Sequence, residues 1–317
     1  MLFILARPAQ PASAVREEEI FRALDARRIS CDTDTVRRAA VAGALTAIDP
    51  GARLATREEA EQPKRGDSIG RAEEWPEGIC YLRLSGIYDG GGTAMVARVS
   101  AWGVAGKSGL ILDLRGAGGS SLDSVDAIAG LFTPSDSELY AVRSSRGATL
   151  AIHRSAAAEA AAKRLPLMLL VDSGTHGASE ALAAALRGRP GVMLIGSRTQ
   201  GDAAVREYLP LSGSNWLYVA TAWILPAGGT AYSRIGVQPD ISASNAPAGS
   251  AISLPSETEI GRKPSSDQAR RDRELMKTVA GDACLGRATD ILLALRALGE
   301  RQSGHEPATH TNHPPGM

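Results

Sequence analysis

Apolar residues recur at helical spacing in the first part of the chain. Residues 15–28 and 36–48 each carry an apolar face, which predicts two helices, and Asp34 is the predicted N-cap of the second. Residues 55–75 are polar and charged and lack an apolar period, so we expect a linker or surface loop there. The chain is therefore expected to open with a helical segment, residues 15–60, followed by a linker at 61–77.

The centre of the chain consists of short, continuous apolar runs that alternate with amphipathic stretches and glycine-rich turns. A run without polar alternation, bounded by glycine or proline, predicts a strand that is buried on both faces. Such runs occupy residues 79–84, 109–114, 166–171 and 192–195, and helices are predicted at 93–102, 121–132 and 178–186. Two further strands are predicted at 204–209 and 216–220. This alternation indicates an α/β domain, placed at residues 78–241.

The periodic pattern of apolar residues is lost after residue 241 and is found again from about residue 268. Residues 242–267 are rich in Ser, Pro, Ala and Gly and are predicted to form a linker. Two helices are predicted within residues 268–300. Residues 301–317 are polar, contain three of the five histidines and are predicted to be disordered, with no functional metal site.

Composition narrows the classes of function. The 317 residues suffice for one large domain or two small ones, and 44% of them are hydrophobic. Lys plus Arg equals Asp plus Glu, 35 each, so neither nucleic acid nor an anionic membrane is expected as a partner. No stretch approaches transmembrane length. Cys31, Cys80 and Cys284 lack metal-ligand spacing, so we expect no zinc site, disulfide framework or cofactor.

The N-terminus admits two interpretations. Residues 2–6 are apolar and Ala12-Ser13-Ala14 matches a signal-peptidase site, whereas the basic start and longer apolar region of a signal peptide are absent. Residues 1–14 are therefore either the end of a signal peptide or a frayed terminus. The first interpretation predicts export to the periplasm or another extracytoplasmic compartment. A mature chain that begins before Val15 would argue against export.

Glycine-rich turns follow two of the buried strands. Residues 113–119 and 172–180 both have a strand–turn–helix form, in which glycine permits a tight turn and leaves backbone N–H groups exposed at a helix start. Such groups can hold an anion or a developing oxyanion. Gly116, Gly118 and Gly119 are the candidate donors, against the alternative of a purely structural turn.

One further glycine motif is interpreted as coincidence. Gly106-Lys107-Ser108 is similar to the end of a phosphate-binding loop, but Ala101 stands where that motif needs glycine. The helix–strand order around it is also wrong for such a loop.

Taken together, these segments resemble the carboxyl-terminal processing, or tail-specific, serine proteases. Residues 113–120 are similar to the family's Asp-Leu-Arg-Gly-Asn-Pro-Gly-Gly, and residues 174–180 to its nucleophile segment, Gly-(Ser/Thr)-Ala-Ser-Ala-Ser-Glu. Residues 196–203 are similar to Gly-x-x-Thr-x-Gly-Lys-Gly, and residues 236–241 to the closing Gly-Ile-x-Pro-Asp-Ile. A Pro-x-Gly turn at 226–228 stands between them, and residues 44–50 look like the end of the family's N-terminal helix.

The resemblance covers residues 35–60 and 78–241 and implies the fold. We expect an α/β protein with a crotonase- or ClpP-like ββα core, a helical N-terminal segment and C-terminal helices. Family members usually carry a peptide-binding PDZ domain before the core. Only 27 residues separate Pro50 from Gly78, too few for such a domain, so tail recognition in the usual manner is not expected.

The resemblance also implies that the catalytic residues are replaced. The family's serine falls on Gly177, its lysine base 25 residues later on Asp202, and the glutamine that supports the lysine on Arg206. Glycine offers no nucleophile, and removal of a catalytic serine costs roughly 10⁶ in turnover. We therefore predict an inactive pseudoprotease that binds a peptide or protein. Asp202 and Arg206 stand four residues apart and are candidates for an ion pair that fills the former site.

Two enzymatic alternatives remain open at this point. The first is a serine-type peptidase with a relocated nucleophile, in which His176 serves as the base for Ser179, Thr175, Ser173 or Ser121. Ser179 lies two positions beyond Gly177, about 200° around a helix, and is expected to pack or cap instead. The second is an acyl-thioester enzyme of the crotonase type that uses residues 116–119 as oxyanion donors, although no nucleotide-binding feature accompanies them.

Overall fold

The computed structural model describes residues 17–62, 66–103, 105–156, 165–213, 215–228, 230–244 and 279–303. Two compact units make up the chain. The first consists of residues 1–60 and 207–219, and the second of residues 61–206 and 220–317. The strand β12 (Asn215–Pro226) and the strand β11 (Ala204–Pro210) each contribute residues to both units.

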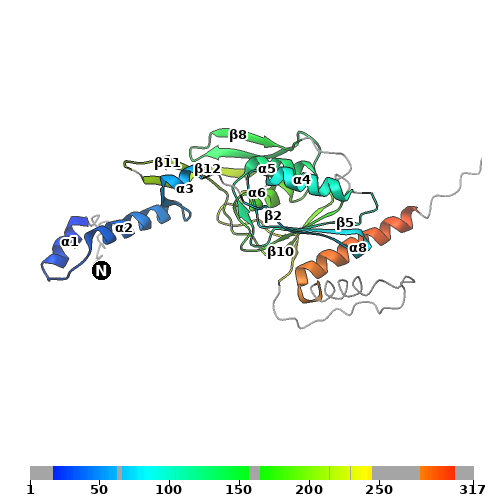
Figure 1. Cartoon of the computed structure of the whole chain (residues 1–317), viewed down its shortest axis with the longest axis horizontal. Helices are drawn as coiled ribbons and strands as arrows, with labels where there is room; N and C mark the ends of the chain where they lie inside the picture. The colour runs from blue at the N-terminus through cyan, green and yellow to red at the C-terminus, as the bar shows by residue number, and fades with distance from the viewer. Residues whose placement is uncertain are drawn as a thin grey trace, which may run out of the picture. The chain divides into compact units, whose positions relative to one another are not determined.

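The first unit combines two helices with short antiparallel strands (Figure 1). Its elements are α1 (Glu17–Asp25), α2 (Thr33–Ile48), β1 (Arg53–Thr56), the start of α3 (Arg57–Glu61) and parts of β11 and β12. Both predicted helices are confirmed, but the N-cap is Asp32 rather than Asp34. The Asp32 carboxylate accepts a hydrogen bond from the Asp34 N–H at 3.1 Å, because the helix begins at Thr33, three residues before its apolar pattern.

A six-stranded sheet forms the centre of the second unit. Its order is β13-β10-β9-β5-β3-β2, with every pair parallel except β2 and β3. The strands are β2 (Ile69–Trp75), β3 (Ile79–Leu84), β5 (Gly109–Asp113), β9 (Leu167–Val171), β10 (Val192–Gly196) and β13 (Ile241–Ser242). All residues of β5 and β9 are buried, which confirms the prediction drawn from their continuous apolar runs.

Helices cover both faces of this sheet (Figure 1). On one face lie α4 (Gly91–Trp102), α5 (Leu122–Gly130) and α6 (Gly177–Leu186), and on the other lies α8 (Ala283–Ser303). The α8 side chains of Leu285, Ala288 and Leu292 pack in a second core cluster with Ile111 and Leu170 of the central strands. The second unit is thus a three-layer α/β structure, as the sequence predicts.

A smaller antiparallel sheet packs on the larger of the two core clusters, called the first core cluster, which includes buried residues of β5, β9, α5 and α6. The strands β7 (Glu138–Ser144) and β8 (Thr149–Arg154) form a hairpin, and β7 also pairs with the last residues of β12. Two-residue strands, β4 (Gly86–Ile87) and β6 (Gly118–Gly119), pair in parallel. The inward residues Tyr140 and Ile224 are buried in the first core cluster. The sequence pattern did not predict this hairpin.

Several predictions are corrected or lie outside the described residues. Residues 55–75 are not a loop, since β1, α3 and the seven-residue strand β2 occupy most of them. A short 3₁₀ turn (Pro76–Gly78) then leads into β3, so the segment predicted as a linker contains a strand of the main sheet. The predictions for residues 1–14, for most of 242–267 and 268–278, and for 304–317 lie outside the described residues.

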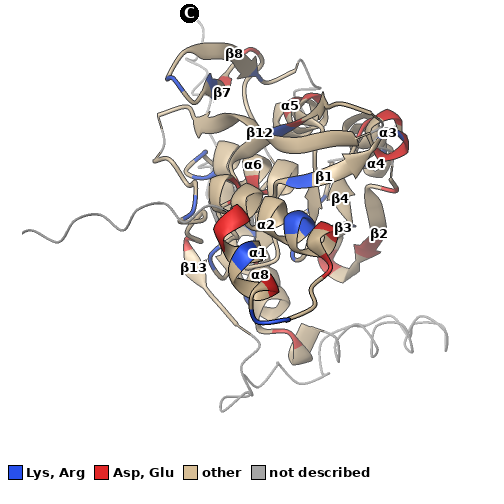
Figure 2. Cartoon of the chain, turned by 90° about the vertical axis from the view of Figure 1, so that its left-hand side faces the viewer, with Lys and Arg blue, Asp and Glu red and all other residues tan. Residues whose placement is uncertain are grey.

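Charge is mixed along the elements of the described chain (Figure 2). Basic and acidic residues are interspersed on helices, strands and turns, in keeping with the formal net charge of zero. Within the described ranges, no helix is both long enough and apolar enough to cross a membrane.

Candidate functional site

Two loops at the carboxyl ends of the central strands β5 and β9 form the candidate site. Because β5 and β9 are parallel neighbours, the turns that follow them lie side by side. The Asp172 carboxylate joins the loops, since its Oδ1 accepts from the N–H of Gly116 at 2.8 Å and from the N–H of Gly174 at 3.0 Å. Thr175 Oγ1 adds a second link by donating to the carbonyl oxygen of Leu114 at 2.8 Å. The loops therefore form one hydrogen-bonded unit.

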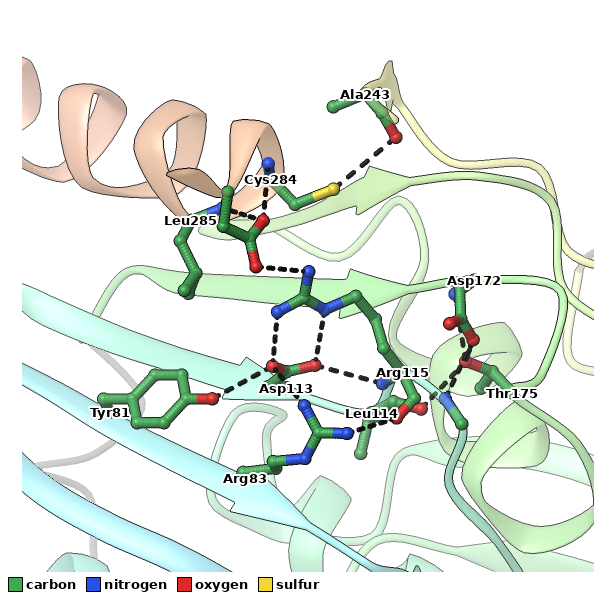
Figure 3. Close-up of polar contacts among 12 residues, drawn as sticks. Tyr81, Arg83, Asp113, Leu114, Arg115, Asp172, Thr175, Ala243, Cys284 and Leu285 are labelled. Atoms are coloured by element: carbon green, nitrogen blue, oxygen red, sulfur yellow. Dashed lines mark hydrogen bonds and ion pairs between the residues drawn. The ribbon is translucent and has the colours of Figure 1, made fainter. Parts of the chain in front are cut away.

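Asp113, the last residue of β5, is surrounded by arginine side chains that pair with its carboxylate (Figure 3). Arg115 Nε and Nη2 donate to its carboxylate at 2.9 and 2.7 Å, and Tyr81 Oη donates at 3.0 Å. Arg83 adds a longer contact at 3.3 Å, and Arg115 also pairs with Asp282 at 2.7 Å. Burial raises the pKa of Asp113, but the hydrogen bonds and charge of Arg115 outweigh it, so the pKa lies below its usual value. These side chains hold the sheet and α8 together.

Gly177 is the first residue of α6 and has no room for a side chain. Its φ is +55°, in the left-handed region that favours glycine. A Cβ atom at this position would lie 2.5 Å from the carbonyl oxygen of Gly119. A serine at position 177 therefore requires a shift of the neighbouring loop.

His176 precedes α6 and uses its ring to fasten the loop. Its Nδ1 donates to the carbonyl oxygen of Gly174 at 2.8 Å, and its backbone N–H donates to that of Ala117 at 3.0 Å. The ring packs on Gly118, where a Cβ atom would lie 2.4 Å from Nε2. Among the described residues, no hydrogen bond joins this ring to a serine or threonine hydroxyl.

Three of the four candidate substitute nucleophiles make structural contacts, and the fourth is exposed. Ser179 is fully buried and donates to the carbonyl oxygen of Gly118 at 2.6 Å. Thr175 is also buried and is held between the two loops. Ser121 caps α5 and accepts from the N–H of Ser124, and Ser173 is exposed. Ser179 therefore packs against the loop, as its position on the helix predicts.

The segments that hold the three candidate oxyanion donors make structural contacts within the fold. The N–H of Gly116 is hydrogen bonded to Asp172. Gly118 and Gly119 form β6, which pairs with β4. It is the carbonyl oxygen of Gly119 that faces position 177, and an acceptor oxygen there repels an oxyanion instead of stabilising it.

Asp202 and Arg206 form a bidentate ion pair. Arg206 Nη1 and Nη2 donate to the two carboxylate oxygens of Asp202 at 2.8 and 2.9 Å. The side chains are only 16% and 13% exposed, so the pair is largely withdrawn from water. The ion pair expected from the spacing is thus present, although Asp202 precedes β11 and the two residues do not share a helix.

Glu180, one turn into α6, ties the helix to the Asp202 loop. Its fully buried carboxylate accepts from the N–H groups of Gly201 and Asp202 at 2.6 and 2.7 Å and from the hydroxyl of Thr199. Burial raises the pKa of Glu180, and the nearby Asp202 charge raises it further. The buried Tyr232 hydroxyl is close to both carboxylates, and its pKa is raised by burial and by their charges. The sequence pattern did not single out Glu180 or Tyr232, because neither belongs to the catalytic set.

Other groups weighed from the sequence do not form a site. Ser108 donates to the carbonyl oxygen of Glu77 and Lys107 pairs with Glu74, so the segment similar to a phosphate-binding loop is occupied by structural contacts. Burial raises the pKa of Cys80 to about 11, which keeps its thiol protonated at neutral pH. In the part of the chain that the structure describes, no cluster of three His, Cys, Asp or Glu residues is arranged to hold a metal.

Comparisons with known proteins agree with this arrangement. The model of peptidase family S41 matches residues 78–243, more than half of the chain. The chain is 28% identical over 161 residues to the chloroplastic C-terminal processing peptidase of Tetradesmus obliquus, a match that covers 51% of this chain and 34% of that protein. It is 30% identical over 164 residues to the carboxyl-terminal-processing protease of Synechocystis sp., covering 52% and 38%. The chain therefore spans little more than a third of these curated relatives.

A solved structure supports the fold alone. A lipoprotein from Streptococcus agalactiae aligns over 73% of this chain and 85% of its own, with a TM-score of 0.51 and 16% identity. The similarity shows that the arrangement of strands and helices recurs in a protein of quite different sequence.

Proposed function

Because the chain belongs to peptidase family S41, we propose that it is a member of that family which binds a peptide or protein without cleaving it. The observation that carries the proposal is the backbone at Gly177, where the carbonyl oxygen of Gly119 lies 2.5 Å from the place a Cβ atom would take. Both the nucleophile and the space that it needs are missing. A serine peptidase has no covalent step without that hydroxyl.

The ion pair at the other two catalytic positions supports the same proposal. A base for serine must accept a proton at neutral pH, which the family's lysine does when burial lowers its pKa. Asp202 is instead committed to Arg206 through two hydrogen bonds. Both carboxylate oxygens of Asp202 already accept from the guanidinium, so we interpret the pair as a structural replacement for the dyad.

A relocated nucleophile is the weaker alternative. Ser179 and Thr175 both donate to backbone carbonyl oxygens, and the His176 Nδ1 does the same. Either hydroxyl would have to give up its hydrogen bond to a carbonyl oxygen before it could pair with the histidine ring. Ser173 is exposed, and among the described residues the histidine ring is hydrogen bonded to the carbonyl oxygen of Gly174 and not to this serine. An acyl-thioester activity is also disfavoured, since the N–H of Gly116 is bound to Asp172.

Peptidase activity is tested with the purified chain, an unstructured protein substrate and a serine-directed phosphonate probe. We expect neither cleavage nor labelling, while an active carboxyl-terminal processing protease under the same conditions shows both. Cleavage that is abolished by Ser179→Ala or Ser173→Ala would contradict the proposal. A triple variant, Gly177→Ser, Asp202→Lys and Arg206→Gln, tests the framework, and labelling of this variant alone supports loss of activity through these positions.

Peptide binding is tested separately on an array of synthetic peptides. Binding of defined sequences, reproduced in solution by calorimetry, is the expected result, and an array without any binder argues against a peptide ligand. Export is a further proposal that rests on residues 12–14, outside the described ranges. Mass spectrometry of the mature N-terminus tests it, with a first residue at or after Val15 as the expected outcome.

A further inference from the structure

A cationic pocket lies at the carboxyl end of α6, apart from Gly177 at the amino end of the same helix. Its volume is about 300 Å³, at the small end of ligand-binding cavities. The pocket is lined by the end of α6, by Arg198 after β10 and by the segment between β12 and β13. It therefore joins three parts of the chain that are distant in sequence.

Three arginines line the pocket, and no acidic residue does so among the described residues. Arg189 donates to two backbone carbonyl oxygens, those of Glu138 at 2.7 Å and Ala185 at 3.3 Å. Arg198 donates to the neutral side chain of Gln238 at 3.0 Å. These contacts orient the two guanidinium groups and leave their charge uncompensated.

Among the described residues, one carboxylate approaches the third arginine. Arg187 Nε lies 3.7 Å from Asp240 Oδ1, and both side chains are more than one-third exposed, so this pair is weak. Asp240 is also engaged with the N–H of Leu194 at 2.9 Å. The pocket thus keeps a positive charge, and a planar guanidinium is well suited to bind a carboxylate through two parallel hydrogen bonds.

The remaining lining is apolar. Ala184, Pro226 and Val237 contribute to the wall, and Ile235 stands beside them with 55% of its surface exposed. An exposed isoleucine next to arginines favours a ligand that pairs an anionic group with an apolar one. A peptide with a carboxylate next to an aliphatic side chain has this combination.

We propose that this pocket binds a carboxylate presented by a peptide, either the free C-terminus or an acidic side chain. The proposal rests on the proposed function in one respect, the peptide nature of the ligand. It differs in location, because the pocket is built from the far end of α6 and does not involve the positions of the lost catalytic residues. Arg198 is the main binding residue, since it is exposed and its hydrogen bond within the described chain goes to a neutral amide.

The test uses calorimetry with three acetylated pentapeptides of one alanine–leucine sequence. The first has a free C-terminal carboxylate, the second is amidated and uncharged, and the third is amidated with one internal glutamate. We expect the first or the third to bind and the second not to bind. Arg198→Gln should weaken that binding by roughly tenfold, equal to about 1.4 kcal/mol, since it removes a hydrogen bond between two charged groups.

Arg154→Gln is the matched control, because Arg154 is an exposed arginine on β8 outside the pocket. It should leave the affinity unchanged. Equal binding of all three peptides, no binding of any, or equal loss in both variants would overturn the proposal. These outcomes are independent of the peptidase assay, so a chain that cleaved substrate and still bound carboxylate through Arg198 would refute only the proposed function.

Discussion

Gly177 combines a left-handed backbone with a close neighbour, and the two effects can be separated by substitution. In Gly177→Ala the left-handed φ costs about 1–2 kcal/mol, and the contact with the carbonyl oxygen of Gly119 adds to it. Gly147 in the β7–β8 turn has φ +82° and no atom within 4 Å of a Cβ. We predict that Gly147→Ala shows the first cost alone and Gly177→Ala a larger loss, measured by denaturant unfolding. Equal losses would mean that position 177 has room for a side chain.

The ion pair at Asp202 and Arg206 is predicted to respond unequally to loss of either partner. Arg206→Gln leaves two carboxylates, those of Asp202 and Glu180, next to each other without the guanidinium, and should cost about 3 kcal/mol. Asp202→Asn removes the charge that raises the pKa of Glu180, so its cost should be smaller. Unfolding free energies of both single variants and the double variant test this order. A larger loss in Asp202→Asn would contradict it.

At the scale of elements, a histidine–aspartate contact attaches the β7–β8 hairpin to α5. His153 Nδ1 lies 2.7 Å from Asp126 Oδ2, Tyr140 Oη donates to the other oxygen at 2.8 Å, and the Tyr140 and His153 rings stack at 4.7 Å. The hydrogen bond to Asp126 raises the pKa of His153 above its usual value, although burial opposes it.

This raised pKa predicts the direction of a pH dependence. A histidine whose pKa is higher in the folded state stabilises the fold fully below its unfolded pKa of about 6.5, and the stabilisation disappears as pH rises through the folded pKa. The difference in melting temperature between the parent and His153→Gln should therefore be largest near pH 6 and shrink toward pH 9. A difference that grows with pH would show that the histidine is neutral in the fold.

The attachment of α8 is predicted to depend on one aspartate. Asp282 pairs with Arg115 at 2.7 Å and also accepts from the N–H groups of Cys284 and Leu285 at the start of the helix. Asp282→Ala removes the ion pair and a cap that contributes about 1 kcal/mol, so amide exchange at residues 283–290 should accelerate by roughly tenfold. Arg296→Gln breaks an exposed pair with Glu77 and serves as the control, with little change expected.

The elements predicted from sequence differ from those that were missed in how strongly one face is buried. The strands β5 and β9 are apolar at nearly every position because both faces are covered, so their pattern is unambiguous. In β8 all residues except His153 are exposed, and β2 has a single buried residue, so neither carries a strong period. Their strand conformation comes from pairing with β7 and β3, which local sequence does not encode.

The candidate site follows the same division. Spacing within the resemblance points to Gly177, Asp202 and Arg206. It also predicts the ion pair between Asp202 and Arg206. The carbonyl oxygen of Gly119 that fills the space at Gly177 was not predicted, since it depends on contacts 58 residues apart along the chain. Glu180 gave no signal either, because a glutamate in the first turn of a helix is also an ordinary feature of helix starts.

At the scale of the whole molecule, the segment that matches the family ends earlier in the chain than the segment that completes the hydrophobic core. The match ends at residue 243, but the second core cluster is completed by α8, whose Leu292 packs onto Gly109 of β5. Without α8, the apolar side chains of Ile111, Met168 and Leu170 would face water, at about 25 cal/mol for each Å² exposed. We therefore predict that a chain ending at 243 binds a hydrophobic dye and aggregates, whereas one ending at 303 unfolds cooperatively like the full chain. A well-folded 243-residue form would show that α8 is dispensable, and then Asp282→Ala should also leave the stability of the sheet unchanged.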